Sequence, residues 1–97
     1  MVVEIADIRV RAEDKVAFAQ AIGRAVATVL PKTAGYLNHS VYSCIETPGR
    51  FVLRIEWETL EAHTVGFRQS PAFAEWRAII GPFFAQPPHV EHFEVVA

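Results

Sequence analysis

Cysteine is the scarcest informative residue type in this sequence, with Cys44 as its single example. One cysteine cannot form a disulfide within the chain, and it cannot supply the several thiolates of a structural metal cluster. We therefore expect Cys44 to serve as a small apolar side chain in a protein of a reducing compartment.

The sequence also lacks a strong excess of one charge and any long apolar run. Nine basic and eleven acidic side chains give a formal net charge of −2, and they are scattered along the chain. This excludes the basic stripe that is typical of nucleic-acid-binding proteins. The first ten residues, MVVEIADIRV, do not have the pattern of an export signal, and no stretch approaches the roughly 20 apolar residues that span a bilayer. We expect a cytoplasmic protein that needs no membrane.

Apolar residues, in contrast, are abundant, because 52% of the 97 residues are hydrophobic. A chain of this length fits a single domain over residues 1–97, and folding hides only about two-thirds of the surface of so small a domain. Some apolar side chains therefore need a second surface to cover them. We expect the chain to form a homodimer.

The first thirty residues predict a strand followed by a long helix. Residues 2–10 alternate between two faces and are rich in β-branched side chains, which is typical of a strand. From about Glu13 to Leu30 the apolar residues recur three or four positions apart, and Pro31 follows. This spacing predicts an amphipathic helix.

The middle of the chain predicts a hairpin of two strands. Residues 35–46 and 50–57 both alternate, and the intervening Thr47, Pro48 and Gly49 favour a turn. In the second strand, Trp57 shares its parity with Phe51, Leu53 and Ile55. We expect this set to face the helices.

The last third predicts a broken helix and a final strand. Thr59 opens a helical stretch, Ser70 and Pro71 interrupt it, and the same two residues restart a helix as N-cap and first-turn proline. The segment PFFAQPP that follows Gly81 is too rich in proline for regular structure, and residues 89–96 predict a strand.

The resulting order is β, α, β, β, broken α, β. With right-handed connections, the simplest solution is an α+β fold in which a ferredoxin-like, four-stranded antiparallel sheet has helices on one face. The other face carries apolar residues of its own. Two such sheets packed face to face would cover both, which agrees with the expected homodimer.

One long segment resembles a known family. The stretch IEWETLEAHTVGFRQSPAFAEWRAIIGPFF, followed by PPHVEHFE, has a strand that ends in Trp, a helix with a spaced His, a Ser-Pro step and a Phe-rich helix. This pattern resembles the antibiotic biosynthesis monooxygenase family, whose members form dimeric α/β barrels. The likeness spans nearly all of the chain, with its specific part between Ile55 and Phe93.

The resemblance implies a cavity between the helices and the sheet of each subunit. There a small electron-rich aromatic or quinol-type substrate would meet O2, and the enzyme would use no flavin, metal or other cofactor. The protein would remove a proton, orient the substrate and keep the pocket dry. The alternative is a dimeric small-molecule-binding or accessory module of the same fold that catalyses nothing.

Three residues are candidates for catalysis. His63 lies six residues after Trp57, and imidazole is the side chain best suited to proton transfer near pH 7. Trp57 is either a pocket wall that stacks on an aromatic substrate or plain core. Arg77 matches a position where some relatives place a cation that steadies an oxyanion, and otherwise it is a solvated helix arginine.

Further residues are candidates for the substrate pocket. Aromatic side chains at helical spacing can be core and pocket lining at once. Asn38 and Tyr42 share one parity of their strand and His39 has the other, so only one of these sets can face the cavity. The candidate pocket residues are Phe67, Phe73, Trp76, Phe83, Phe84, Asn38 and Tyr42.

The sequence does not favour a metal or haem site. No two histidines have the helical spacing of a ligand pair, and His89 and His92 fall on opposite faces of a strand. Trp76 and Asp7 occupy the places where haem-degrading relatives carry a histidine and an asparagine. Phe67 and Leu53 also replace polar residues that some quinol-oxidising or polyketide-oxidising relatives carry, which leaves His63 without an expected helper.

Overall fold

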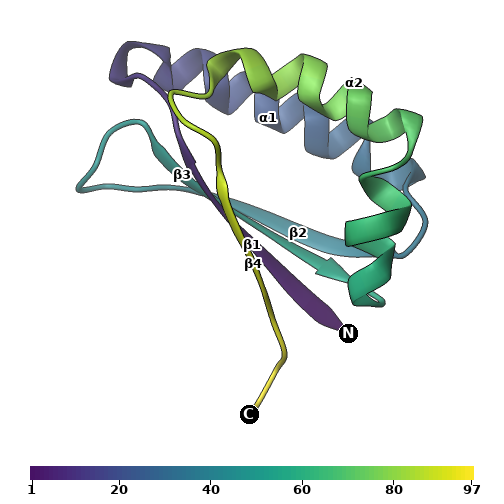
Figure 1. Cartoon of the computed structure of the whole chain (residues 1–97). Coiled ribbons are helices and arrows are strands. Elements are labelled where there is room, and N and C mark those ends of the chain that lie inside the picture. The colour runs from purple at the N-terminus through teal and green to yellow at the C-terminus, as the bar shows by residue number, and fades with distance from the viewer.

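The computed structural model describes residues 1–97 and has an α+β architecture, as expected. Four strands form one antiparallel sheet in the order β2-β3-β1-β4, and the helices lie together on one side of it (Figure 1). The strands are β1 (Val2–Arg9), β2 (Tyr36–Ser43), β3 (Arg50–Trp57) and β4 (His89–Phe93). This is the predicted ferredoxin-like topology.

The longer helices are α1 (Lys15–Thr28) and α2 (Pro71–Ile80). Short turns flank them: η1 (Ala12–Asp14), η2 (Leu30–Lys32), η3 (Ala62–Phe67) and η4 (Gly81–Phe83). The structure contains no helix long and apolar enough to span a membrane.

The main core lies between the sheet and the helices. Strand β3 alternates strictly between buried and half-buried residues, and its buried set ends in Trp57, which is fully buried. Phe18 of α1 is also fully buried, and its ring centroid lies 4.8 Å from that of Phe51. The predicted direction of the Phe51, Leu53, Ile55 and Trp57 set is therefore confirmed.

The break in the second helical region occurs where the sequence predicts it. Thr59 Oγ1 accepts a hydrogen bond from the backbone N–H of Ala62 at 3.1 Å, and Ser70 with Pro71 begins α2. Ser70 is the N-cap residue, but its hydroxyl donates to the carbonyl of Phe67 at 2.7 Å instead of accepting from α2. The serine thus closes the first piece and the proline starts the second.

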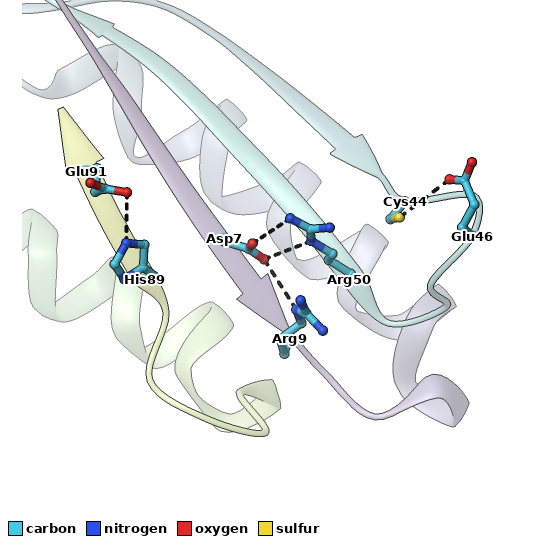
Figure 2. Close-up of polar contacts among 7 residues, drawn as sticks. All are labelled: Asp7, Arg9, Cys44, Glu46, Arg50, His89 and Glu91. Atoms are coloured by element: carbon cyan, nitrogen blue, oxygen red, sulfur yellow. Dashed lines mark hydrogen bonds and ion pairs between the residues drawn. The ribbon is translucent and has the colours of Figure 1, made fainter. Parts of the chain in front are cut away.

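The face of the sheet that points away from the helices carries a polar network (Figure 2). Arg50 of β3 donates to Asp7 of β1 at 2.8 and 3.2 Å, and Arg9 lies 3.4 Å from the same carboxylate. The Arg50 guanidinium holds the pKa of Asp7 below its usual range. Asp7 lies on the face of the sheet away from the helices, so it cannot contribute to a cavity between the sheet and the helices.

Figure 2 also places Cys44 just beyond β2, at the edge of the hairpin. It is half-buried, and its thiol lies 3.9 Å from a carboxylate oxygen of Glu46. It belongs to neither the core nor the cavity described below.

Candidate functional site

A cavity of about 580 Å³ lies between α2 and the helix-facing side of β1, β3 and β4. The segment from Phe84 to Pro88 forms another part of its wall. The sheet contributes Glu4, Ala6, Ile8, Leu53, Ile55 and Val90, and the helical region contributes His63, Phe67, Phe73, Trp76 and Ile80. The walls are mainly apolar, so the few polar groups stand out.

Glu4 is the buried acidic residue of this cavity, with 5% of its surface exposed. Alternation along β1 places it on the same face as Ala6 and Ile8, which are core residues. Its carboxylate oxygen Oε1 accepts a hydrogen bond of 3.0 Å from the indole Nε1–H of Trp57. The carboxyl group is therefore held among apolar side chains by one defined donor.

His63 lies beside that carboxyl group and is only 4% exposed. It sits in η3, a π-helical turn in which the backbone N–H of Arg68 donates to the His63 carbonyl at 3.1 Å. Single π turns are frequent at functional sites. The imidazole stacks on Trp57, with centroids 5.1 Å apart and an interplanar angle of 21°.

Both ring nitrogens of His63 have partners. Nε2 lies 3.4 Å from Glu4 Oε1, and Nδ1 lies 2.7 Å from Nε2 of His92. His92 reaches this position because it stands opposite Glu4 in the pairing of β4 with β1. The three side chains form a chain in the order Glu4, His63, His92.

Burial sets the charge states of Glu4 and His63. Desolvation raises the pKa of Glu4 from 4.5 to about 7, against the opposing effects of the Trp57 hydrogen bond and the Arg68 charge. Desolvation also lowers the pKa of His63 from 6.5 to about 4, with help from Arg68 and His92. At neutral pH the imidazole is thus uncharged while the carboxyl group can gain or lose a proton.

The three catalytic candidates from the sequence lie close to the Glu4–His63–His92 contacts or to the cavity. His63 and Arg77 line the cavity, whereas Trp57 lies behind His63 and is fully buried. The Arg77 guanidinium lies 5.9 Å from the centre of the Phe73 ring and has no acidic partner within ion-pair distance. The structure thus places a free cation at the cavity.

Most of the aromatic pocket candidates also line the cavity, namely Phe67, Phe73, Trp76 and Phe84. Phe83 does not, because it packs against Phe18 of α1 with ring centroids 5.7 Å apart. Phe83 is therefore partly buried against the core under α1 and does not point into the cavity.

The expected positions of Asn38 and Tyr42 in the pocket are wrong. These residues stand opposite Glu56 and Val52 of β3, on the face that points away from the helices. A bulge between Tyr36 and Asn38 shifts the alternation of β2. As a result His39 points to the helix side, where its Nδ1 lies 2.6 Å from the Tyr36 hydroxyl, but it does not reach the cavity.

The histidines do not converge on a common point. His63 contacts His92, His39 contacts Tyr36, and His89 contacts Glu91 on the opposite face of β4 (Figure 2). No group of three His, Cys, Asp or Glu side chains has an arrangement that could hold a metal ion.

Two residues of the site, Glu4 and His92, were not among the sequence candidates. The signal for Glu4 was present, because a carboxylate shares its strand parity with Ala6 and Ile8. His92 alternates with the exposed His89 and Glu91, which is a weaker signal. Its role depends on the register of β4 against β1, which no local pattern reports.

Comparison with known proteins agrees with the fold. The family model described as antibiotic biosynthesis monooxygenase matches residues 1–79. The chain is 42% identical over 73 residues to the uncharacterized protein YczJ of Bacillus subtilis (strain 168). The matched stretch covers 75% of this chain and 77% of that protein.

Solved structures show the same similarity. A protein from Bordetella bronchiseptica assigned to antibiotic biosynthesis monooxygenases has 35% identity and a TM-score of 0.94, with 99% of this chain and 97% of that one covered. SnoaB, a cofactor-independent oxygenase from Streptomyces nogalater, has 15% identity and a TM-score of 0.79, over 97% and 91% of the two chains. At that identity the second likeness shows the fold alone.

Proposed function

Because this chain belongs to the antibiotic biosynthesis monooxygenase family, we propose that its cavity binds a small electron-rich aromatic or quinol-type substrate and oxidises it with O2. In this reaction one oxygen atom enters the substrate and the other leaves as water. The substrate loses two hydrogens and supplies all the electrons, so the protein itself needs no flavin or metal. Its tasks are to bind, to orient and to move protons.

The observation that carries this proposal is the buried Glu4 and His63 pair in an apolar cavity. Oxidation of a phenol or of an activated ring carbon begins with loss of a proton, because the resulting anion passes an electron to O2 more readily. A carboxyl group with a pKa of about 7 is well matched to accept that proton at neutral pH. The neutral imidazole of His63 orients the carboxyl group and can share the proton.

The cavity suits a substrate of this class. Its volume of about 580 Å³ falls within the roughly 300–1,000 Å³ of typical ligand sites. Trp76, Phe67 and Phe73 present aromatic surface, against which a planar ring can stack. A substrate bound against these largely apolar walls would displace water, which would strengthen the electrostatic effect of each polar group on it.

Two arginines provide positive charge for a developing anion. Arg68 and Arg77 both line the cavity, and neither has an acidic partner within ion-pair distance. Arg68 already acts on the site, because its charge lowers the pKa of Glu4. In the proposed reaction Arg77 has the predicted role of stabilising the substrate oxyanion.

We further propose that the functional unit is a homodimer in which the open faces of two sheets pack together. On this face the side chain of Tyr42 is 52% exposed and that of Phe93 is 49% exposed. They pair with Val52 and Val3 respectively, so each of the four strands contributes an apolar side chain to this face. Packing of two such faces would cover it.

Oxygen uptake tests the function directly. Metal-free protein would be mixed with a panel of dihydroxyaromatics and quinols, with His63→Ala as the site variant and His89→Ala as the matched control on the opposite face of β4. We expect uptake with at least one compound, lost in His63→Ala and retained in His89→Ala. Tight binding without turnover across the panel would instead support a non-catalytic binding module.

A further inference from the structure

The chain of three polar side chains extends beyond what the removal of one proton requires. We propose that Glu4, His63 and His92 form a proton relay, in which Glu4 takes the substrate proton inside the cavity and His92 releases it to water outside. The use of the relay in turnover rests on the proposed function. Its existence is a property of the resting protein.

The position of His92 gives the relay its direction. Glu4 and His63 both line the cavity and are about 95% buried, whereas His92 is only half-buried and does not line the cavity. His63 is the one link between them, because its two ring nitrogens face the other two residues. The relay thus leads from a buried carboxyl group to a partly exposed imidazole.

The hydrogen bonds of this chain can be satisfied in two ways. When Glu4 is protonated, its O–H faces the bare Nε2 of His63, and the Nδ1–H of His63 donates to Nε2 of His92. When Glu4 is ionised, the Nε2–H of His63 faces the carboxylate, and the Nε2–H of His92 donates to Nδ1 of His63. Both arrangements pair a donor with an acceptor at each contact.

Conversion of the first arrangement into the second moves one proton out of the protein. The proton of Glu4 passes to Nε2 of His63, the proton on Nδ1 of His63 passes to Nε2 of His92, and the proton on Nδ1 of His92 leaves to water. Only O–H and N–H bonds form and break, and no electron is transferred. Glu4 is then ionised and can accept another proton, and both rings must return to their Nδ1–H forms before a second proton passes along the relay.

The surrounding charges favour passing the proton along the relay over holding it on one of the histidine rings. Arg68 is a charged group that acts on all three members, and it lowers the pKa of each. Arg77 lines the same cavity, and Asp7 of β1 lies on the opposite face of the sheet. No acidic group other than Glu4 lies within ion-pair distance of His63 or His92, and burial lowers the pKa of both rings, which disfavours a cation on either.

The two contacts differ in length. The 2.7 Å between His63 and His92 is a short hydrogen bond, whereas the 3.4 Å between His63 and Glu4 is longer than a good one. Catalytic hydrogen bonds are often long without ligand and tighten when substrate is bound. We therefore expect the Glu4 contact to be the slower link.

The relay can be tested without any substrate by nitrogen NMR of the histidine rings. In uniformly ¹⁵N-labelled protein, the ring shifts report which nitrogen of His63 carries the proton. Between about pH 5 and about pH 9 we expect the proton to move from Nδ1 to Nε2 while the ring stays neutral. In Glu4→Gln this change should be absent, and in His89→Gln it should be retained. A His63 tautomer that stays fixed in the wild type, or that changes equally in Glu4→Gln, would overturn the relay.

A kinetic experiment tests its use in turnover. With a substrate found by oxygen uptake, His92→Gln should lower kcat by about 10-fold or more, leave KM nearly unchanged and be partly rescued by added imidazole. His89→Gln should behave as the wild type. Unchanged kcat in His92→Gln would show that the proton leaves by another route. If no compound supports uptake, the proposed function fails, while a tautomer change in His63 would still establish the relay.

Discussion

Trp57 donates its indole N–H to the carboxyl group of Glu4 at 3.0 Å, across 53 positions of sequence. The same indole stacks on the imidazole of His63. One fully buried side chain therefore fixes both members of the proposed acid–base pair. Trp57 acts from behind the cavity and does not form its wall.

This dual role predicts a large effect of truncation at Trp57. Trp57→Ala should lower the free energy of unfolding by about 3–5 kcal/mol, because it removes a fully buried aromatic side chain. Trp76→Ala should lower it by less, since Trp76 borders an open cavity. Urea unfolding of the two variants measures the difference, and equal losses would contradict the assignment of Trp57 to the core.

Glu4 predicts a distinctive pH dependence of stability. Its pKa rises from 4.5 to about 7 on folding, so between these values the native state binds more protons than the unfolded state. The free energy of unfolding contributed by Glu4 is therefore full below about pH 4.5 and is lost as the pH rises through about 7. His63 has the opposite sign, because its pKa falls from 6.5 to about 4, and its contribution grows with pH over that interval.

Comparison with Glu4→Gln isolates the carboxyl group, because the His63 contribution is common to both proteins. An interval from pH 4.5 to about 7, at about 1.4 kcal/mol per pH unit, corresponds to about 3 kcal/mol. We expect Glu4→Gln to gain about that much stability relative to the wild type across this interval, as measured by urea unfolding. A difference that stays constant with pH would contradict the buried, protonated carboxyl group.

Arg68 should act on the site through its charge. Because that charge lowers the pKa values of Glu4, His63 and His92, Arg68→Gln should raise all three. The effect should shrink at high salt, since Arg68 is exposed. Arg77→Gln is the matched control, because Arg77 lines the same cavity without being a cause of these shifts. NMR titration at low and high salt would measure both variants, and equal effects would refute a specific action of Arg68.

Much of the fold could be predicted from local pattern. Alternation identified the first three strands and the helix-facing side of β3, the proline-rich segment marked where β4 could begin, and Ser70 with Pro71 marked the helix break. The π turn at η3 could not be predicted, because it depends on backbone hydrogen bonds that no residue type specifies. The bulge between Tyr36 and Asn38 likewise reversed the expected direction of Asn38 and Tyr42.

The candidate site could be predicted from the sequence less completely than the fold. His63 could be proposed from a family resemblance, but its partners come from β1 and β4, 59 and 29 positions away. Glu4 and His92 meet His63 only because β4 pairs with β1 in one register. Sequence alone therefore predicted one member of a three-residue chain.

The proposed homodimer predicts a particle of about twice the 10.8 kDa chain mass. Light scattering at micromolar concentration would measure it. Tyr42→Lys should weaken the dimer, because it places a charge on the open face of the sheet, whereas Leu60→Lys, at an exposed position in the helical region, should not. A wild-type protein that is monomeric at this concentration would rule out the packed-sheet dimer.

The most direct test of the central claim is the titration of the Glu4 side-chain carboxyl carbon by ¹³C NMR in the unliganded protein. A buried carboxyl group that serves as the proton acceptor of the cavity should titrate with a midpoint near pH 7, in step with the change in the His63 ring. A midpoint near the ordinary value of 4.5 would show a solvated carboxylate and contradict the proposed acid–base chemistry.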